Sequence, residues 1–247
     1  MKKQLYRLLV CVVGLSSTAV LNAQQGMDEI VVTGSRMSSG VGSYRSDVVP
    51  VVHIKRRPDF MVVDAMIESD SRSAPIRRKE IDKTLASLAR QAAKTEHIEL
   101  GLARVFPTEN DDIEYIVDFD IDAVEVVSGR RPDTSRVALV IKSPLLDTDE
   151  TPDDVYSRIE SFVESVDEEG RAIASDSGDM NFSLIGISQF REPLMKLLAE
   201  DNEKLRGVFG DDYNVHITGL ELPVQWRVSG PMELVIYFPY SSTLIVD

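Results

Sequence analysis

The sequence is poor in the residues that most often carry chemistry. It holds one cysteine, Cys11, and three histidines, His53, His97 and His216. Cys11 lies in an N-terminal stretch that we expect to be removed, which would leave no thiol for disulfides, thiol catalysis or cysteine-ligated metal. The three histidines are far apart, and none has another histidine at helical metal-ligand spacing. The sequence therefore predicts no metal and no cofactor.

Positive charge is also scarce. Lys and Arg number 27 against 41 Asp and Glu, for a net charge of −14. Removal of the N-terminal residues Lys2, Lys3 and Arg7 would make the balance still more acidic. Because basic surfaces bind phosphates and anionic headgroups, this composition argues against nucleic acid and anionic lipid as partners.

Long apolar runs are absent except near the N-terminus, where residues 8–13 are apolar and the run continues more weakly to Leu21. A basic start, an apolar stretch too short to span a bilayer and a small residue at Ala23 are typical of a signal peptide. We therefore expect residues 1–23 to be cleaved and the mature chain, beginning near Gln24, to lie in the periplasm of a Gram-negative bacterium. It would have no integral membrane segment. An uncleaved anchor and association with the outer membrane stay open.

Residues 24–47 are rich in Gly and Ser and show no apolar period, which predicts a flexible tail. The folded body is expected at 48–247. Strands are expected at 48–55, 59–69, 98–105, 113–127, 136–144 and 181–188 and repeatedly over 213–240, and helices after Ser73, after Thr151 and up to about Arg206.

Strands outnumber helices in this pattern. It predicts an α+β fold, with a mixed, largely antiparallel sheet and about three helices packed on it. Two related β-α-β units at 48–127 and 134–247 fit the pattern as well as a single irregular domain does.

The first two helices carry the clearest local patterns. Ser73 and Pro75 suit the start of the first, and Thr151 with Asp154 forms a capping box at the start of the second. The apolar stripes are Ile81, Leu85, Leu88 and Ala92 in the first helix, and Val155, Ile159, Phe162, Val163 and Val166 in the second.

The segment 113–127 alternates between apolar and polar residues, so we expect a half-buried antiparallel strand. Ile121 would lie on its buried face and Asp120 in solvent. Asp118, Asp120 and Asp122 also resemble part of a calcium loop. That loop needs Gly at its sixth position, where this chain has Ala123, and an extended strand would spread the three carboxylates apart.

Enzyme motifs are absent. Ser183, Ser188 and Ser229 lack the G-x-S-x-G elbow, and the chain has no G-x-G-x-x-G or Walker loop. The sequence therefore favours a protein without enzymatic activity. A hydrolase whose site assembles only in three dimensions remains an alternative.

One short motif does resemble a known segment. The run DEIVVTGSR, residues 28–36, resembles the TonB-box region that follows the signal peptide of TonB-dependent outer-membrane receptors. That resemblance implies strand addition to the periplasmic protein TonB, through an extended segment with a free backbone. The candidate partner-binding residues are Glu29, Ile30, Val31, Val32, Thr33 and Gly34.

The body resembles another family. The segments DFMVVDAMIES, RRKEIDKTLASLARQA, IELGLAR and IEYIVDFDI together are similar to SIMPL-domain proteins, a secreted bacterial family of mixed α/β architecture. The usual Asn-rich stretch of that family is missing from the helix. The resemblance implies a periplasmic or surface-exposed protein, often oligomeric, with no established chemistry.

These observations predict an exported, SIMPL-like binding or scaffolding protein. An accessory of TonB-dependent uptake that engages TonB through residues 29–34 is one alternative, and the hydrolase is the other. A homo-oligomer is compatible with each of the three.

Overall fold

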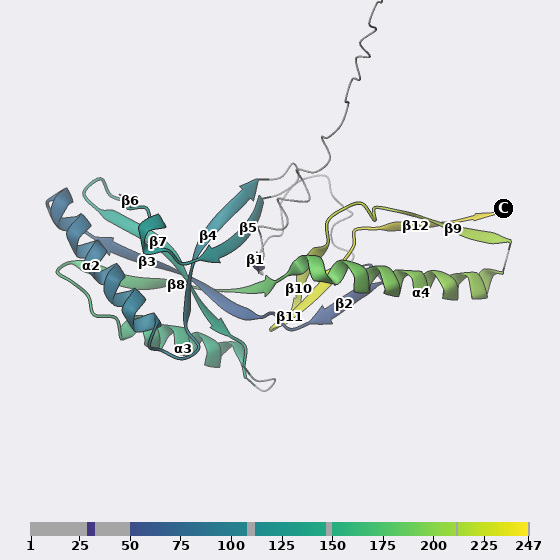
Figure 1. Cartoon of the computed structure of the whole chain (residues 1–247), viewed down its shortest axis with the longest axis horizontal. Helices are drawn as coiled ribbons and strands as arrows, with labels where there is room; N and C mark the ends of the chain where they lie inside the picture. The colour runs from purple at the N-terminus through teal and green to yellow at the C-terminus, as the bar shows by residue number, and fades with distance from the viewer. Residues whose placement is uncertain (1–28, 33–49, 108–111, 147–149, 211, 247) are drawn as a thin grey trace, which may run out of the picture.

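The computed structural model describes residues 29–32, 50–107, 112–146, 150–210 and 212–246, and its fold is α+β, as expected (Figure 1). All strand pairs in the described part of the chain are antiparallel. The strands are β1 (Glu29–Val32), β2 (His53–Arg56), β3 (Phe60–Ser69), β4 (Glu99–Pro107), β5 (Asp112–Asp118), β6 (Val127–Ser128), β7 (Ser135–Pro144), β8 (Ala172–Ile185), β9 (Tyr213–Thr218), β10 (Gln225–Gly230), β11 (Glu233–Tyr237) and β12 (Ser241–Val246). The α-helices are α2 (Ala74–Ala92), α3 (Pro152–Glu164) and α4 (Arg191–Phe209), and short 3-10 helices occur at η1 (Ile121–Ala123) and η2 (Ile187–Phe190).

Six strands form a closed barrel. They follow one another in the order β3, β8, β1, β5, β4 and β7, and β7 pairs back onto β3. The two-residue strand β6 extends β7. Helices α2 and α3 both pack against β3, β7 and β8 and cover one side of the barrel (Figure 1). The main apolar core lies between these helices and the barrel wall.

The two predicted apolar stripes are confirmed, but Ser73, at the N-cap of α2, makes no capping hydrogen bond with its side chain. Helix α2 has Pro in its first turn, and its predicted stripe is buried. Helix α3 begins with the capping box: Asp154 N–H donates to Thr151 Oγ1 over 3.3 Å, and Thr151 N–H donates to Asp154 Oδ2 over 2.9 Å. One basic residue of α2, Arg77, is buried, and its guanidinium donates to the Ser71 carbonyl over 2.8 Å.

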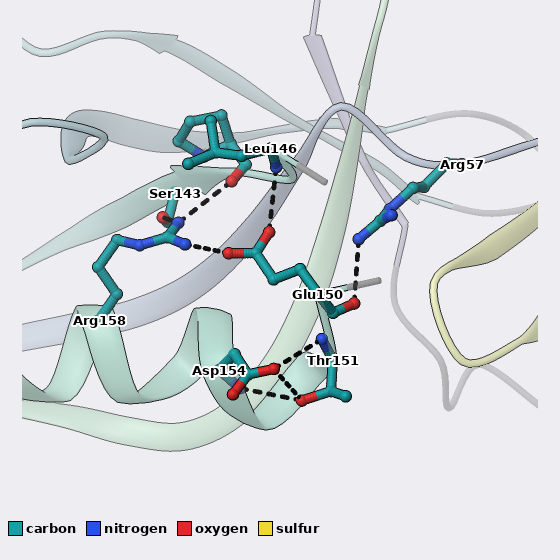
Figure 2. Close-up of polar contacts among 8 residues, drawn as sticks. Arg57, Ser143, Leu146, Glu150, Thr151, Asp154 and Arg158 are labelled. Atoms are coloured by element: carbon teal, nitrogen blue, oxygen red, sulfur yellow. Dashed lines mark hydrogen bonds and ion pairs between the residues drawn. The ribbon is translucent and has the colours of Figure 1, made fainter. Parts of the chain in front are cut away.

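A polar cluster around Glu150 fastens the start of α3 to the barrel (Figure 2). The Glu150 carboxylate pairs with Arg158 and accepts from Leu146 N–H over 3.0 Å. Arg158 also donates to Ser143 Oγ over 2.6 Å, at the end of β7, and Arg57 donates to the Glu150 carbonyl over 3.2 Å. Because each of these groups has a structural partner, the cluster is explained as an anchor for the helix.

The rest of the chain forms a C-terminal module beside the barrel (Figure 1). Strands β10, β11 and β2 make a three-stranded sheet, and β9 and β12 make a two-stranded ribbon along α4. Strand β2 therefore belongs with residues 187–246 in space. The predicted division near 127–134 falls inside the barrel, since β5 and β7 flank the same strand, β4.

The predicted strand 113–127 is shorter than expected. Strand β5 ends at Asp118 and is followed by η1, where the Asp120 side chain accepts from Asp122 N–H over 3.0 Å. Ile121 is 41% exposed, so the expectation that it is buried is wrong. Ile116, which the alternation places on the same face as Asp120, is buried instead, because it packs inside the barrel against Val31, Val62 and Val140.

The N-terminal segment differs most from expectation. Glu29–Val32 was expected within a flexible tail, yet it is strand β1, paired with β5 on one side and β8 on the other. All four residues are buried. The sequence reads as a tail because the partners, near residues 115 and 183, are far away in the chain.

None of the helices in the described segments is long and apolar enough to cross a membrane.

Candidate functional site

The middle of the barrel is closed by four apolar side chains. Val31, Val62, Ile116 and Val140 form a small buried cluster inside it. Gly101 of β4 faces the same cluster, and a Cβ at that position would lie 2.5 Å from Ile116 Cγ2 and 3.0 Å from Val140 Cγ2. The barrel therefore needs glycine at position 101 to pack, and its two ends are separate compartments.

One end of the barrel opens into a cavity of about 900 Å³. It forms because β4 pairs with β7 only at residues 99–101, after which the two strands part. Side chains of β3, β4, β7 and β8 and of the segment after β5 line it, and those used below are Asp64, Met66, Glu68, Ala103, Arg104, Glu125, Arg130, Arg136, Ala138, Val140, Asp176 and Asp179.

A bulge in β8 forms part of the cavity wall. Val63 pairs with Met180 but Ala65 pairs with Asp176, so residues 177–179 fall outside the regular register. Gly178 there has φ of +75°, a conformation that glycine adopts without strain. Asp176 Oδ1 holds the bulge by accepting from Gly178 N–H over 2.9 Å and from the Tyr156 hydroxyl over 2.7 Å. The hydrogen bond between the Tyr156 hydroxyl and Asp176 is the main reason that the pKa of Tyr156 is raised to about 12.

The bulge brings two carboxylates together in the cavity wall. Asp64 projects from β3, and Asp179 from the bulge of β8. Burial raises the pKa of Asp64, and the negative charge of Asp179 raises it further. Asp64 lies opposite Val140, so this acidic pair sits directly beside the apolar cluster that closes the barrel.

Arginines line the outer part of the same cavity. Arg136 of β7 lies opposite Glu68 in the strand register, and Glu68 is four residues further along β3 than Asp64. The Arg136 guanidinium lies 3.8 Å from Met66 Sδ. Arg104 and Arg130 are the other two cationic groups in the lining, and both are exposed. The lining thus carries both signs of charge. Asp64 and Asp179 lie next to the apolar cluster, and Arg136 lies further along the wall together with Glu68 and Glu125, with Met66 and Ala138 between.

The other end of the barrel holds a buried ion pair that includes the first residue of β1. Lys142 Nζ lies 2.7 Å from Glu29 Oε2 and 3.1 Å from Glu99 Oε2, and it stands 4.6 Å from the centre of the Phe60 ring. Ser183 Oγ donates to the second oxygen of Glu29. Burial alone would lower the pKa of Lys142, but the hydrogen bonds and charges of Glu29 and Glu99 hold it above its ordinary value.

The structure describes four of the six predicted partner-binding residues. Glu29, Ile30, Val31 and Val32 come together in β1, where both strand edges are already paired within the chain. Thr33 and Gly34 lie outside the described residues. Ser183, considered and rejected as a nucleophile, is the hydroxyl that binds Glu29.

The calcium-like residues do not converge. Asp118 ends β5, while Asp120 caps η1 and Asp122 lies within it. In the part of the chain that the structure describes, no three His, Cys, Asp or Glu side chains are grouped so as to hold a metal ion.

Sequence reasoning missed the cavity residues. Asp64 is the one sign that was available, since it interrupts the apolar run of FMVVDAMIES. Asp179 and Arg136 reach the cavity only through the barrel closure and the bulge, which involve strands more than about 65 residues apart in the chain.

Comparison with protein-family models, with curated proteins and with solved structures finds no match to this chain.

Proposed function

We propose that the protein is an exported, non-enzymatic binding protein whose barrel cavity holds a small zwitterionic ligand with an apolar middle, such as a short peptide. The observation that carries this proposal is the distribution of charge around the 900 Å³ cavity, with Asp64 and Asp179 next to the apolar cluster and Arg136 four residues further along the barrel wall. A free amine would bind at the carboxylates, and a carboxylate would bind the guanidinium.

The spacing of the charges sets the size of the ligand. Asp64 and Glu68 are four residues apart on β3, and Arg136 lies across from Glu68, so the two charged regions are separated by roughly 13 Å at about 3.3 Å per residue. Side chains reaching inward from both regions shorten this span. An extended tripeptide, at roughly 10 Å, matches it.

The lining between the charged groups suits small apolar side chains. Met66, Ala103, Ala138 and Val140 face this part of the cavity, and two of the four are alanines that leave room for a ligand. Ligand pockets of this kind are mostly apolar, with a few polar groups that set orientation.

Calorimetric titration of the full-length protein with alanyl-valyl-alanine tests the proposal. We expect binding by the free peptide, and affinity about tenfold weaker in the double variant Asp64→Asn/Asp179→Asn, equivalent to about 1.4 kcal/mol. Arg136→Gln should weaken binding of the free peptide but not of its C-terminal amide. Equal binding of free, N-acetylated and amidated peptides, or no binding at millimolar peptide, would refute the proposal.

Matched controls keep the charge changes outside the cavity. Asp133→Asn and Arg72→Gln alter exposed residues that do not line it and should leave the affinity unchanged. Mass spectrometry of the peptide after incubation separates this proposal from the hydrolase alternative. That alternative has one observation in its favour, namely that Asp64 and Asp179 form a carboxylate pair with a raised pKa at Asp64. Binding predicts an intact peptide, whereas cleavage lost in the double variant would favour a hydrolase.

The periplasmic location and the SIMPL-like identity belong to the same proposal and rest on the sequence patterns. N-terminal sequencing of a periplasmic extract should find a mature chain that starts near Gln24. Engagement of TonB through residues 29–34 has less support, because Glu29–Val32 would first have to leave the barrel.

A further inference from the structure

The gap between β5 and β8 is a slot one strand wide. Each of these two strands has its other edge occupied, β5 by β4 and β8 by β3. With neighbouring strands about 4.8 Å apart, the edges of β5 and β8 that face each other are roughly 9–10 Å apart, which is the space of one strand. Among the residues that the structure describes, Glu29–Val32 fills that space.

The slot recognises its strand through side chains as well as backbone. Glu29 is bound by Lys142 and Ser183, Val31 enters the apolar cluster of the barrel interior, and Ile30 and Val32 enter the main core on the opposite face. The required pattern is an acidic residue followed by three β-branched aliphatic residues. Strand addition of this kind takes affinity from the backbone and specificity from alternate side chains.

An empty slot would leave the barrel open. Two strand edges would be without partners, and Lys142, 7% exposed, would lose the closer of its two carboxylates. Open edges of this kind pair readily with another strand. The slot therefore needs a strand to fill it. Its contacts select the sequence of that strand, but they do not require the strand to come from the same molecule.

The source of the strand is not determined by these contacts. The strand and ion-pair partners of Glu29–Val32 lie in β5, β8 and β7, and the strand also contacts β10. Residues 33–49 join β1 to the rest of the chain, and 17 residues span up to about 56 Å when fully extended. This is long enough for β1 to reach the same slot in a neighbouring molecule.

We propose that the β5–β8 slot is a strand-acceptor site that takes Glu29–Val32 from a second copy of this chain, so that two molecules exchange β1. This inference does not depend on the proposed cavity ligand. Exchange of an identical element is a known low-cost route to dimers. The linker gives the strand of the same molecule an effective concentration on the order of 1 mM, so exchange becomes appreciable as protein concentration approaches that value.

A pair of cysteine variants tests the exchange. The mature chain is expected to have no cysteine, and Val31 lies directly opposite Ser183 in the register. Full-length Val31→Cys and Ser183→Cys proteins, like all variants of this test, also carry Cys11→Ser. They are unfolded, mixed and refolded together near 1 mM under mild oxidation, and the products are separated by non-reducing electrophoresis. Exchange predicts a disulfide between one chain of each variant.

Two controls make every outcome informative. The double variant Val31→Cys/Ser183→Cys in a single chain should form the disulfide at low concentration, which checks the register. A mixture of Asp133→Cys with Ser183→Cys measures random cross-linking at an exposed position. If the double variant cross-links but the mixture gives no more heterodimer than this background, the slot accepts β1 only from its own chain. If the double variant fails to cross-link, the register on which the proposal rests is wrong.

Discussion

Lys142 and Glu29 are charged residues in the interior of the barrel, with side chains 8% and 10% exposed. A buried pair of this kind adds little net stability, yet removing one partner leaves the other charge buried and uncompensated. The pair therefore acts mainly to specify which strand closes the barrel. The two ends of the barrel thus differ in their charges: one end holds the buried Lys142–Glu29 pair, and the other holds the acidic pair and the arginines of the cavity.

Lys142→Met should destabilise the protein by about 3–5 kcal/mol, because the Glu29 carboxylate would stay buried without its cation. The double variant Glu29→Gln/Lys142→Met should recover most of that loss, since neither charge remains. Urea denaturation measures both. Lys55→Met is the control: its pair with Glu233 is exposed, so the cost should be below about 1 kcal/mol. Similar losses in all three variants would contradict the role given to the buried pair.

Asp64 should make stability depend on pH. Its pKa in the folded protein lies above the ordinary value of 3.8, so ionisation favours unfolding. The stabilising contribution of Asp64 is fully present below that value and is lost as pH rises through the folded-state pKa. The melting temperature of wild type should therefore fall relative to that of Asp64→Asn as pH rises from about 3 to 7. Parallel melting profiles of the two proteins would show that Asp64 is not perturbed.

At the element scale, the bulge of β8 is the feature that adds a charged group to the cavity lining. It adds residues opposite Asp64 and places Asp179 over the cavity. Bulges next to functional sites commonly re-aim a side chain in this way. The bulge depends on Gly178, whose φ of +75° is unfavourable for any residue with a Cβ.

Gly178→Ala should cost about 1–2 kcal/mol of stability, because it forces an L-residue into the left-handed region. A Cβ there would meet only the Tyr156 hydroxyl at 3.9 Å, so the loss comes from the backbone alone. Gly207→Ala, in α4 with nothing within 4 Å of its Cβ, should instead stabilise by up to about 1 kcal/mol. Calorimetry on the two variants checks the contrast, and a neutral effect at position 178 would mean that the bulge conformation is different.

Elements that depend on neighbouring residues could be predicted from the sequence. The capping box at Thr151 and the stripe from Ile81 to Ala92 are local patterns, and both are present. Strand β1 and the cavity could not be predicted, because they depend on pairing across more than about 65 residues. Alternation also misled at Ile116, since it assumes that one face of the strand is wet.

At the scale of the whole molecule, the chain crosses between the C-terminal module and the barrel near Asp59 and again near Ile185. Asp59 pairs with Arg56 and accepts from Ile185 N–H over 2.8 Å, so one side chain ties both crossings. Arg56 also lies over the ring of Phe190, at the start of α4. These contacts make the two parts mechanically continuous.

Asp59→Ala should therefore loosen the C-terminal module before the barrel. Hydrogen exchange should show protection lost in β2 and β11 while α2 and α3 keep theirs, because the latter pack on the far part of the barrel wall. Asp133→Ala, an exposed residue, should change neither. Uniform loss of protection across both parts would indicate a single cooperative unit.

The position of β1 also sets the order in which the chain can fold. This strand is made early in synthesis, yet its partner residues 182–185 come about 150 residues later. The pairing of β3 with β8 spans a similar length of chain. Contacts this far apart in sequence form slowly, since a long loop must close before any stabilising contact is made. Closure of the barrel is therefore a late event, and until it occurs the residues of β1 remain as an exposed β-prone segment that chaperones or other chains can bind.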